Sequence, residues 1–154
     1  MIENYNRTDH FSHKMLCVHP NCKQASECLR YHCAHHLSDQ VQHFTILNPN
    51  HLKVDSEQSC PYHLPIRKVS YAKGFIQWLD NLPKKESKTA ANTLRKHFSY
   101  RTYYRMRNGE HLLTPSEQDQ LQCILKQNGI TTPIQFDEYH EDYLWESSQV
   151  QLSF

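Results

Sequence analysis

Apolar residues in the second half of the chain recur at the three- and four-residue spacing of helices that bury one face. A first helix is predicted over residues 69–82, because Pro83 then ends the pattern. A second helix is predicted over residues 84–97. The apolar stripes consist of Ala72, Phe75, Ile76 and Leu79 in the first helix and Ala90, Ala91, Leu94 and Phe98 in the second.

Two more helices are predicted from residues that favour helix ends. Ser99 is a good N-cap for a short helix over residues 100–107, which Asn108-Gly109 should end through a left-handed residue. The sequence Thr114-Pro115-Ser116-Glu117 combines an N-cap Thr, Pro at the first helical position and Glu at the third. It predicts a capping box and a helix that Gly129 ends.

The first 66 residues show much weaker periodicity. A helix is expected over residues 28–36, within a segment (25–37) that lacks Pro and Gly, and a short strand over residues 44–47, before Asn48-Pro49-Asn50. The predicted fold is therefore mainly α. An N-terminal Cys-rich, irregular α+β module (1–66) precedes a basic helical domain (67–130). An acidic aromatic tail (131–154) should pack on that domain, because so many aromatic side chains should not remain in water.

The N-terminal module contains five of the six cysteines. No apolar run is long enough to cross a bilayer, and the first residues lack the basic and hydrophobic regions of a signal peptide. We therefore expect a cytoplasmic protein without membrane contact. In that reducing compartment the cysteines should be free thiols, metal ligands or redox groups rather than disulfides.

Four cysteines have a spacing that suggests metal binding. Cys17, Cys22 and Cys28 form the pattern C-x4-C-x5-C, and Cys60 follows after a polar loop. Four thiolates could hold a zinc ion or an iron-sulfur cluster, or the cysteines could be small buried side chains. His32 lies one helical turn after Cys28 and is an alternate ligand, as is Cys33.

Charge is strongly segregated along the chain. Residues 67–107 contain eleven of the seventeen Lys and Arg but only two acids, whereas residues 108–154 contain one basic residue and eight acids. The first region therefore carries a net charge of +9 in a chain whose total is +1. This asymmetry indicates a surface that binds a polyanion, most plausibly nucleic acid, although a solvated helical surface would give the same pattern.

The predicted nucleic-acid contacts lie on the second and third helices of the basic domain. Arg101 and Arg105, one turn apart, would reach bases or phosphates, and Tyr100, Tyr103, Tyr104 and Arg107 would cover the adjoining surface. Tyr100 and Tyr104 could instead pack into the core, and RNA remains an alternative to DNA. The expected phosphate contacts are Lys84, Lys85, Lys88, Arg95 and Lys96.

Two resemblances extend this interpretation. The segment LRKHFSYRTYYRMRNGEHLLTPSEQDQLQCILKQNGI, residues 94–130, resembles small phage-repressor-type helix-turn-helix domains, which implies DNA binding with residues 100–107 as recognition helix. Over its whole length, with CVHPNCKQASECLR, Cys60-Pro61, YYRMRNG, TPSEQ and FDEY, the chain resembles an uncharacterised bacterial family, a domain of unknown function. That second resemblance implies no activity.

Enzymatic motifs are missing from the sequence. Only three glycines occur, so no Gly-rich phosphate loop exists, and neither a serine elbow nor a His-Glu-x-x-His helix is present. The expected function is DNA binding, regulatory in the simplest case, with a metal-stabilised or redox-sensitive Cys-rich module. The alternative is a zinc or iron-sulfur protein that serves as a protein-interaction or structural module.

Overall fold

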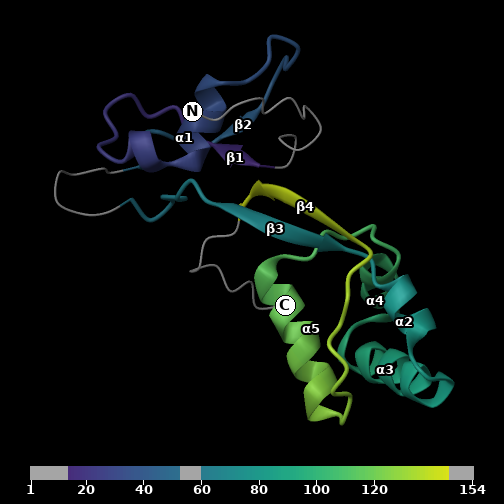
Figure 1. Cartoon of the computed structure of the whole chain (residues 1–154). Helices are drawn as coiled ribbons and strands as arrows, with labels where there is room; N and C mark the ends of the chain where they lie inside the picture. The colour runs from purple at the N-terminus through teal and green to yellow at the C-terminus, as the bar shows by residue number, and fades with distance from the viewer. Residues whose placement is uncertain (1–13, 53–59, 146–154) are drawn as a thin grey trace. The chain divides into compact units, whose positions relative to one another are not determined.

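The computed structural model describes residues 14–52 and 60–145, and its contacts form two compact units (Figure 1). The first unit contains the described residues up to Arg67, together with Trp145. The second unit extends from Lys68 to Leu144. Across both described ranges, no helix is long and apolar enough to cross a membrane.

The first unit has little regular structure. Strand β1 (Met15–Leu16) pairs in parallel with β2 (Thr45–Ile46), within the strand predicted over residues 44–47. The helix predicted over residues 28–36 corresponds to α1 (Leu29–His35), and a 3-10 helix, η2 (Ala25–Glu27), precedes it. Cys28 separates the two with an extended backbone, ψ 117°, and forms an antiparallel bridge with Pro65.

The core of the first unit is small. Leu16, Leu29 and Leu64 are fully buried, and Cys17 packs in a separate cluster with two further leucines, Leu47 and Leu52. Three of the eight buried apolar residues described in this unit are cysteines, Cys17, Cys28 and Cys33. Such a core supplies little hydrophobic stabilisation for a segment of this length.

The second unit contains an antiparallel two-stranded sheet, β3 (Lys68–Lys73) with β4 (Glu138–Tyr143). The helix predicted over residues 69–82 is therefore wrong in its first half. Residues 69–73 alternate in burial as a strand does, and their pairing partner is about 70 residues away in sequence. Gly74, with φ +67°, follows the strand, and helix α2 (Ile76–Asn81) begins two residues later.

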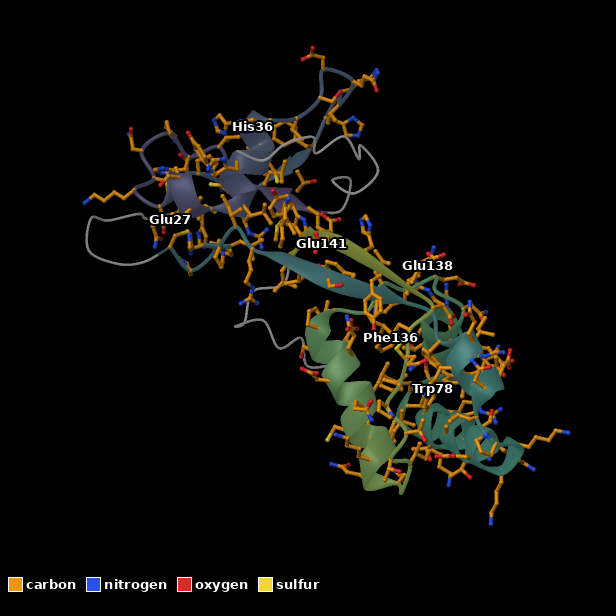
Figure 2. All side chains as sticks on the ribbon, viewed as in Figure 1. Glu27, His36, Trp78, Phe136, Glu138 and Glu141 are labelled. Carbon is orange, nitrogen blue, oxygen red and sulfur yellow. The ribbon has the colours of Figure 1, made fainter. Side chains whose placement is uncertain are left out.

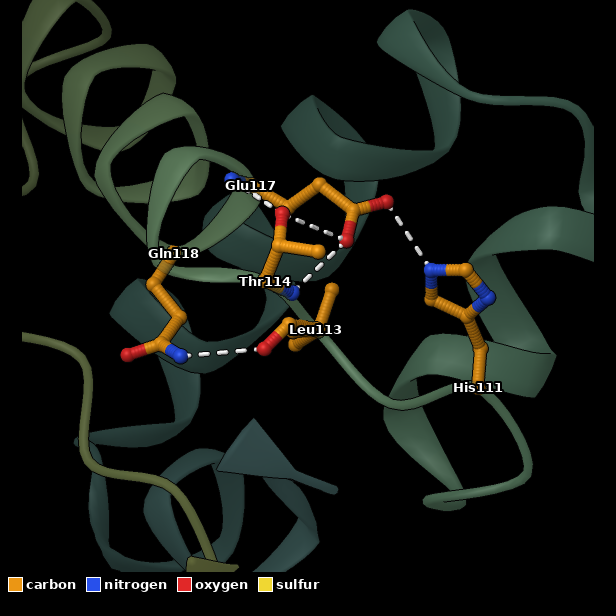
Figure 3. A network of polar contacts seen from close by, with 5 residues as sticks. All are labelled: His111, Leu113, Thr114, Glu117 and Gln118. Atoms are coloured by element: carbon orange, nitrogen blue, oxygen red, sulfur yellow. Dashed lines mark hydrogen bonds and ion pairs between the residues drawn. The ribbon is translucent and has the colours of Figure 1, made fainter. Parts of the chain in front are cut away.

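The other three helices of this unit confirm the sequence prediction. They are α3 (Lys84–His97), α4 (Tyr100–Arg107) and α5 (Pro115–Gln127). The Ser99 hydroxyl accepts a hydrogen bond from the Thr102 N–H, and Thr114 forms a capping box with Glu117 (Figure 3). The fold is thus mixed α and β, not mainly α.

The helices and the sheet share one hydrophobic core. Phe75, Leu94, Leu113, Leu121 and Leu125 are fully buried in it, and Phe136 packs against its edge (Figure 2). A helix-turn-helix is not identified among the described residues. Helix α4 follows α3 after a short turn at Ser99, whereas α5 follows α4 through a connection in which Leu113 hydrogen-bonds to Ala72 of β3 through both backbone groups.

The acidic segment after α5 is part of the second unit. Its residues 138–143 form β4, and Tyr143 is buried, whereas Tyr139 is 60% exposed. Asp137 accepts hydrogen bonds from the N–H groups of Ile76 and Gln77, at 2.9 and 3.0 Å, and so caps α2. Glu138 forms a 3.2 Å ion pair with Lys73 across the sheet. The first acids of this segment therefore bind α2 and β3.

Candidate functional sites, a thiol cluster and a basic helical surface

Backbone hydrogen bonds bring together three of the cysteines in the first unit. The Cys17 N–H donates to the Arg30 carbonyl, which holds the strand β1 segment against α1. The Cys22 carbonyl accepts from Ala25, and the Ala25 carbonyl accepts from Cys28. The 3-10 turn makes the chain between Cys22 and Cys28 compact. This irregular backbone therefore brings the two residues closer together than an extended chain would.

Cys60 approaches the same place through a separate set of hydrogen bonds. Its N–H donates to Gln24 Oε1 at 3.0 Å, between Cys22 and Cys28 in sequence. Beyond it, the Leu29 N–H donates to the Leu64 carbonyl at 2.7 Å, and the Ile66 N–H donates to Glu27. The segment that carries Cys60 is thereby held along the segment that carries Cys28.

The Cys17 thiol is affected by the other three cysteines. Burial raises the pKa of the Cys17 thiol, a hydrogen bond with the His19 backbone opposes this, and Cys28, Cys22 and Cys60 raise it further. Cys17 is therefore a protonated thiol in this environment rather than an activated nucleophile. The hydrogen bonds bring together the segments that carry the four cysteines predicted from the sequence.

The side chains are not arranged at the spacing of a closed metal site. Within residues 14–52 and 60–145, no three Cys, His, Asp or Glu side chains are close enough together to hold an ion. The alternate ligand His32 hydrogen-bonds to the Ser26 carbonyl at 2.8 Å, and its ring stacks on His36. Cys33 is buried on α1 and is not among the groups that affect the Cys17 pKa.

Two histidines close in sequence to the four cysteines were not predicted as site residues. His19 Nδ1 and His63 Nε2 are buried atoms without a hydrogen-bond partner among the described residues. Unpaired buried polar atoms are costly, so each needs an explanation. Their sequence signal is proximity, since His19 follows Cys17 by two residues and His63 follows Cys60 by three. Twelve histidines in the chain obscure that signal.

The second candidate site is the basic α3–α4 surface. We define it by seven exposed side chains, which are Lys84, Lys85, Lys88, Arg95 and Lys96 on α3 and Arg101 and Arg105 on α4. Residues 84–107 contain eight Lys and Arg against one acid, Glu86, a net charge of +7. None of the seven forms an ion pair with an acid in the part of the chain described.

The aromatic residues of α4 divide between core and surface. Tyr103 was predicted as a surface contact, but it is 2% exposed and packs edge-on against Phe75, so it is unavailable to a ligand. Tyr104 is half-buried against the core, and Arg107 lies 5.9 Å from its ring centroid. Tyr100 is 72% exposed, with its ring centroid 4.5 Å from that of Tyr104.

Comparison with known proteins assigns a family but no activity. The model of the family of unknown function DUF6078 matches residues 1–145. The chain belongs to this family. No curated protein and no solved structure matches the chain. For this DUF6078 chain, the geometry of the thiol cluster and the basic α3–α4 surface is what supports a function.

Proposed function

We propose that this protein binds nucleic acid through the basic α3–α4 surface. The observation that carries the proposal is the concentration of seven exposed cations on two consecutive helices. Nucleic acid is the polyanion that matches such a charge, because Lys and Arg contacts to phosphates release condensed counterions.

Among the described residues, no acid forms an ion pair with the seven cations, which favours a binding surface over a merely solvated one. A surface that needs only solubility usually mixes the two signs of charge. Here two acids at the start of β4 are used elsewhere, since Glu138 pairs with Lys73 and Asp137 caps α2. Neither neutralises the α3 and α4 cations that define the surface, and these form no ion pair within the described part of the chain.

Arg101 and Arg105 should contribute most on α4. They are exposed and lie four residues apart, so they project from one side of the helix. Arg107, predicted as a further contact, is half-buried beside Tyr104 and Asn108 and has less freedom to reach a ligand. Phosphate contacts of this kind give affinity without sequence selectivity.

Fluorescence anisotropy with labelled duplex DNA, single-stranded DNA and single-stranded RNA tests the proposal. The full chain should bind at low salt, and Arg101→Ala with Arg105→Ala should weaken binding roughly tenfold or more at about 0.1 M salt. A matched control removes two exposed cations elsewhere, Lys23→Ala with Lys126→Ala. Equal weakening of both double variants, or no binding by the wild type, contradicts the proposal.

A further inference from the structure

The first unit contains a cluster of donors whose chemistry differs from that of the basic surface. The segments that carry Cys17, Cys22, Cys28 and Cys60 lie together there, because the Arg30 carbonyl, Gln24 Oε1 and the Leu64 carbonyl accept hydrogen bonds from the N–H groups of Cys17, Cys60 and Leu29. We propose that Cys17, Cys22, Cys28 and Cys60 together bind one structural zinc ion. The four cysteines belong to the first unit, whereas the basic α3–α4 surface belongs to the second.

Thiolates suit zinc better than most other ions. Structural zinc sites are typically tetrahedral with four Cys or His ligands. Two of the cysteines, Cys17 and Cys28, are buried, and the other two are partly buried. An ion bound there would be shielded from water and would have no open position for catalysis, as expected of a structural site.

The composition of the unit supplies a physical reason for such an ion. Its core consists of a few leucines and the cysteines themselves, and its two strands are two residues long each. Small irregular units of this kind are commonly stabilised by a metal, because ligation joins segments that a small core cannot hold.

Two unpaired histidine nitrogens support a zinc-thiolate centre, because such a centre would accept hydrogen bonds from them. His19 Nδ1 and His63 Nε2 are buried without a partner, and each belongs to a residue close in sequence to a proposed ligand. Thiolates bound to a metal accept hydrogen bonds from surrounding donors, which orient them. A zinc-thiolate centre would therefore give these nitrogens a function that the protein alone does not provide.

Binding would have to draw the side chains together. The sulfurs do not have ligand spacing as they stand, whereas each must lie about 2.3 Å from a bound zinc ion. Ligation also replaces the thiol protons. We therefore expect a measurable local rearrangement of the segments around Cys22 and Cys60 when the ion binds.

Elemental analysis of the untagged full chain, purified without added metal under reducing conditions, is the direct test. The expected result is about one zinc per chain. Cys60→Ser should lose the zinc, whereas Cys123→Ser, an exposed cysteine on α5 in the other unit, should keep it. Equal zinc contents in the two variants would overturn the assignment.

A spectroscopic measurement on the wild-type chain keeps the test valid if Cys60→Ser fails to fold. The metal-free chain, titrated with Co²⁺, should show thiolate-to-metal charge transfer and tetrahedral ligand-field bands that saturate at one equivalent, and Zn²⁺ should abolish them. A chain that contains no metal and takes up neither ion refutes the site. Stoichiometric iron with visible absorption refutes zinc.

Discussion

Tyr100 is exposed at the beginning of α4, and its ring lies against the ring of Tyr104. The ring of Tyr104 in turn contacts the ring of the buried Tyr103. The aromatic contacts thus extend from the core to the surface beside Arg101. Exposed aromatic rings next to cations stack on unpaired bases, and each such stack contributes about 1–3 kcal/mol. If the proposed ligand is single-stranded, Tyr100 should be a principal contact.

We therefore predict that Tyr100→Ala weakens binding of single-stranded RNA or DNA by roughly tenfold and leaves duplex binding nearly unchanged. Tyr139→Ala is the control, because Tyr139 is also exposed but lies on β4. Anisotropy titrations with both forms of nucleic acid measure the difference. An equal loss for duplex and single strand would refute stacking and leave phosphate contacts alone.

Asp137 is a second single residue with a testable role, which is to stabilise the fold rather than to bind a ligand. Its two carboxylate oxygens each accept one N–H at the start of α2, where a short helix has no other side-chain cap. Asp137→Ala should lower the free energy of unfolding by about 1 kcal/mol, in the range of lost N-caps. Urea denaturation followed by circular dichroism measures it. Asp119→Ala, an exposed acid on α5, should change stability little.

At the scale of elements, local signals predicted the helices and the short strand β2 but missed β1, β3 and β4. The capping box at Thr114 and the cap at Ser99 depend on residues within four positions, so the sequence states them directly. Strand β3 depends on β4, which is remote in sequence, and the apolar positions Ala72, Phe75 and Ile76 fit a helix equally well.

The capping box also predicts a pH dependence. Burial alone would raise the pKa of Glu117, but hydrogen bonds from His111 and Thr114 outweigh it and lower that pKa (Figure 3). A carboxyl group whose pKa is lowered by folding stabilises the fold above its ordinary pKa, about 4.3, and loses this contribution as pH falls through the folded value.

The stability advantage of the wild type over Glu117→Gln should therefore be greatest near neutral pH and shrink between about pH 5 and pH 3. Urea denaturation at a series of pH values measures this, and Glu110→Gln, an exposed acid in the preceding turn, should show no such trend. A difference that stays constant or grows on acidification would show that the carboxylate charge does not stabilise the helix.

At the scale of the whole molecule, the two candidate sites differ in how far the sequence could predict them. Cysteine spacing indicated the four thiols of the cluster. The hydrogen bonds that hold their segments together involve Gln24 and Leu64, and nothing in the sequence marks these two residues. Charge segregation located the basic surface, because exposed cations need no tertiary partner. It could not show that Tyr103 is buried or that Asp137 and Glu138 are engaged with α2 and β3.

The salt dependence of nucleic-acid binding tests the central claim most directly. Each phosphate contact made by Lys or Arg steepens the slope of log affinity against log salt concentration by about 0.9 for duplex DNA. Relative to the wild type, Arg101→Ala with Arg105→Ala should flatten that slope by about 1.8, and Lys23→Ala with Lys126→Ala should leave it unchanged. An affinity that does not depend on salt, or a slope that is the same in all three proteins, would contradict phosphate binding by the basic α3–α4 surface.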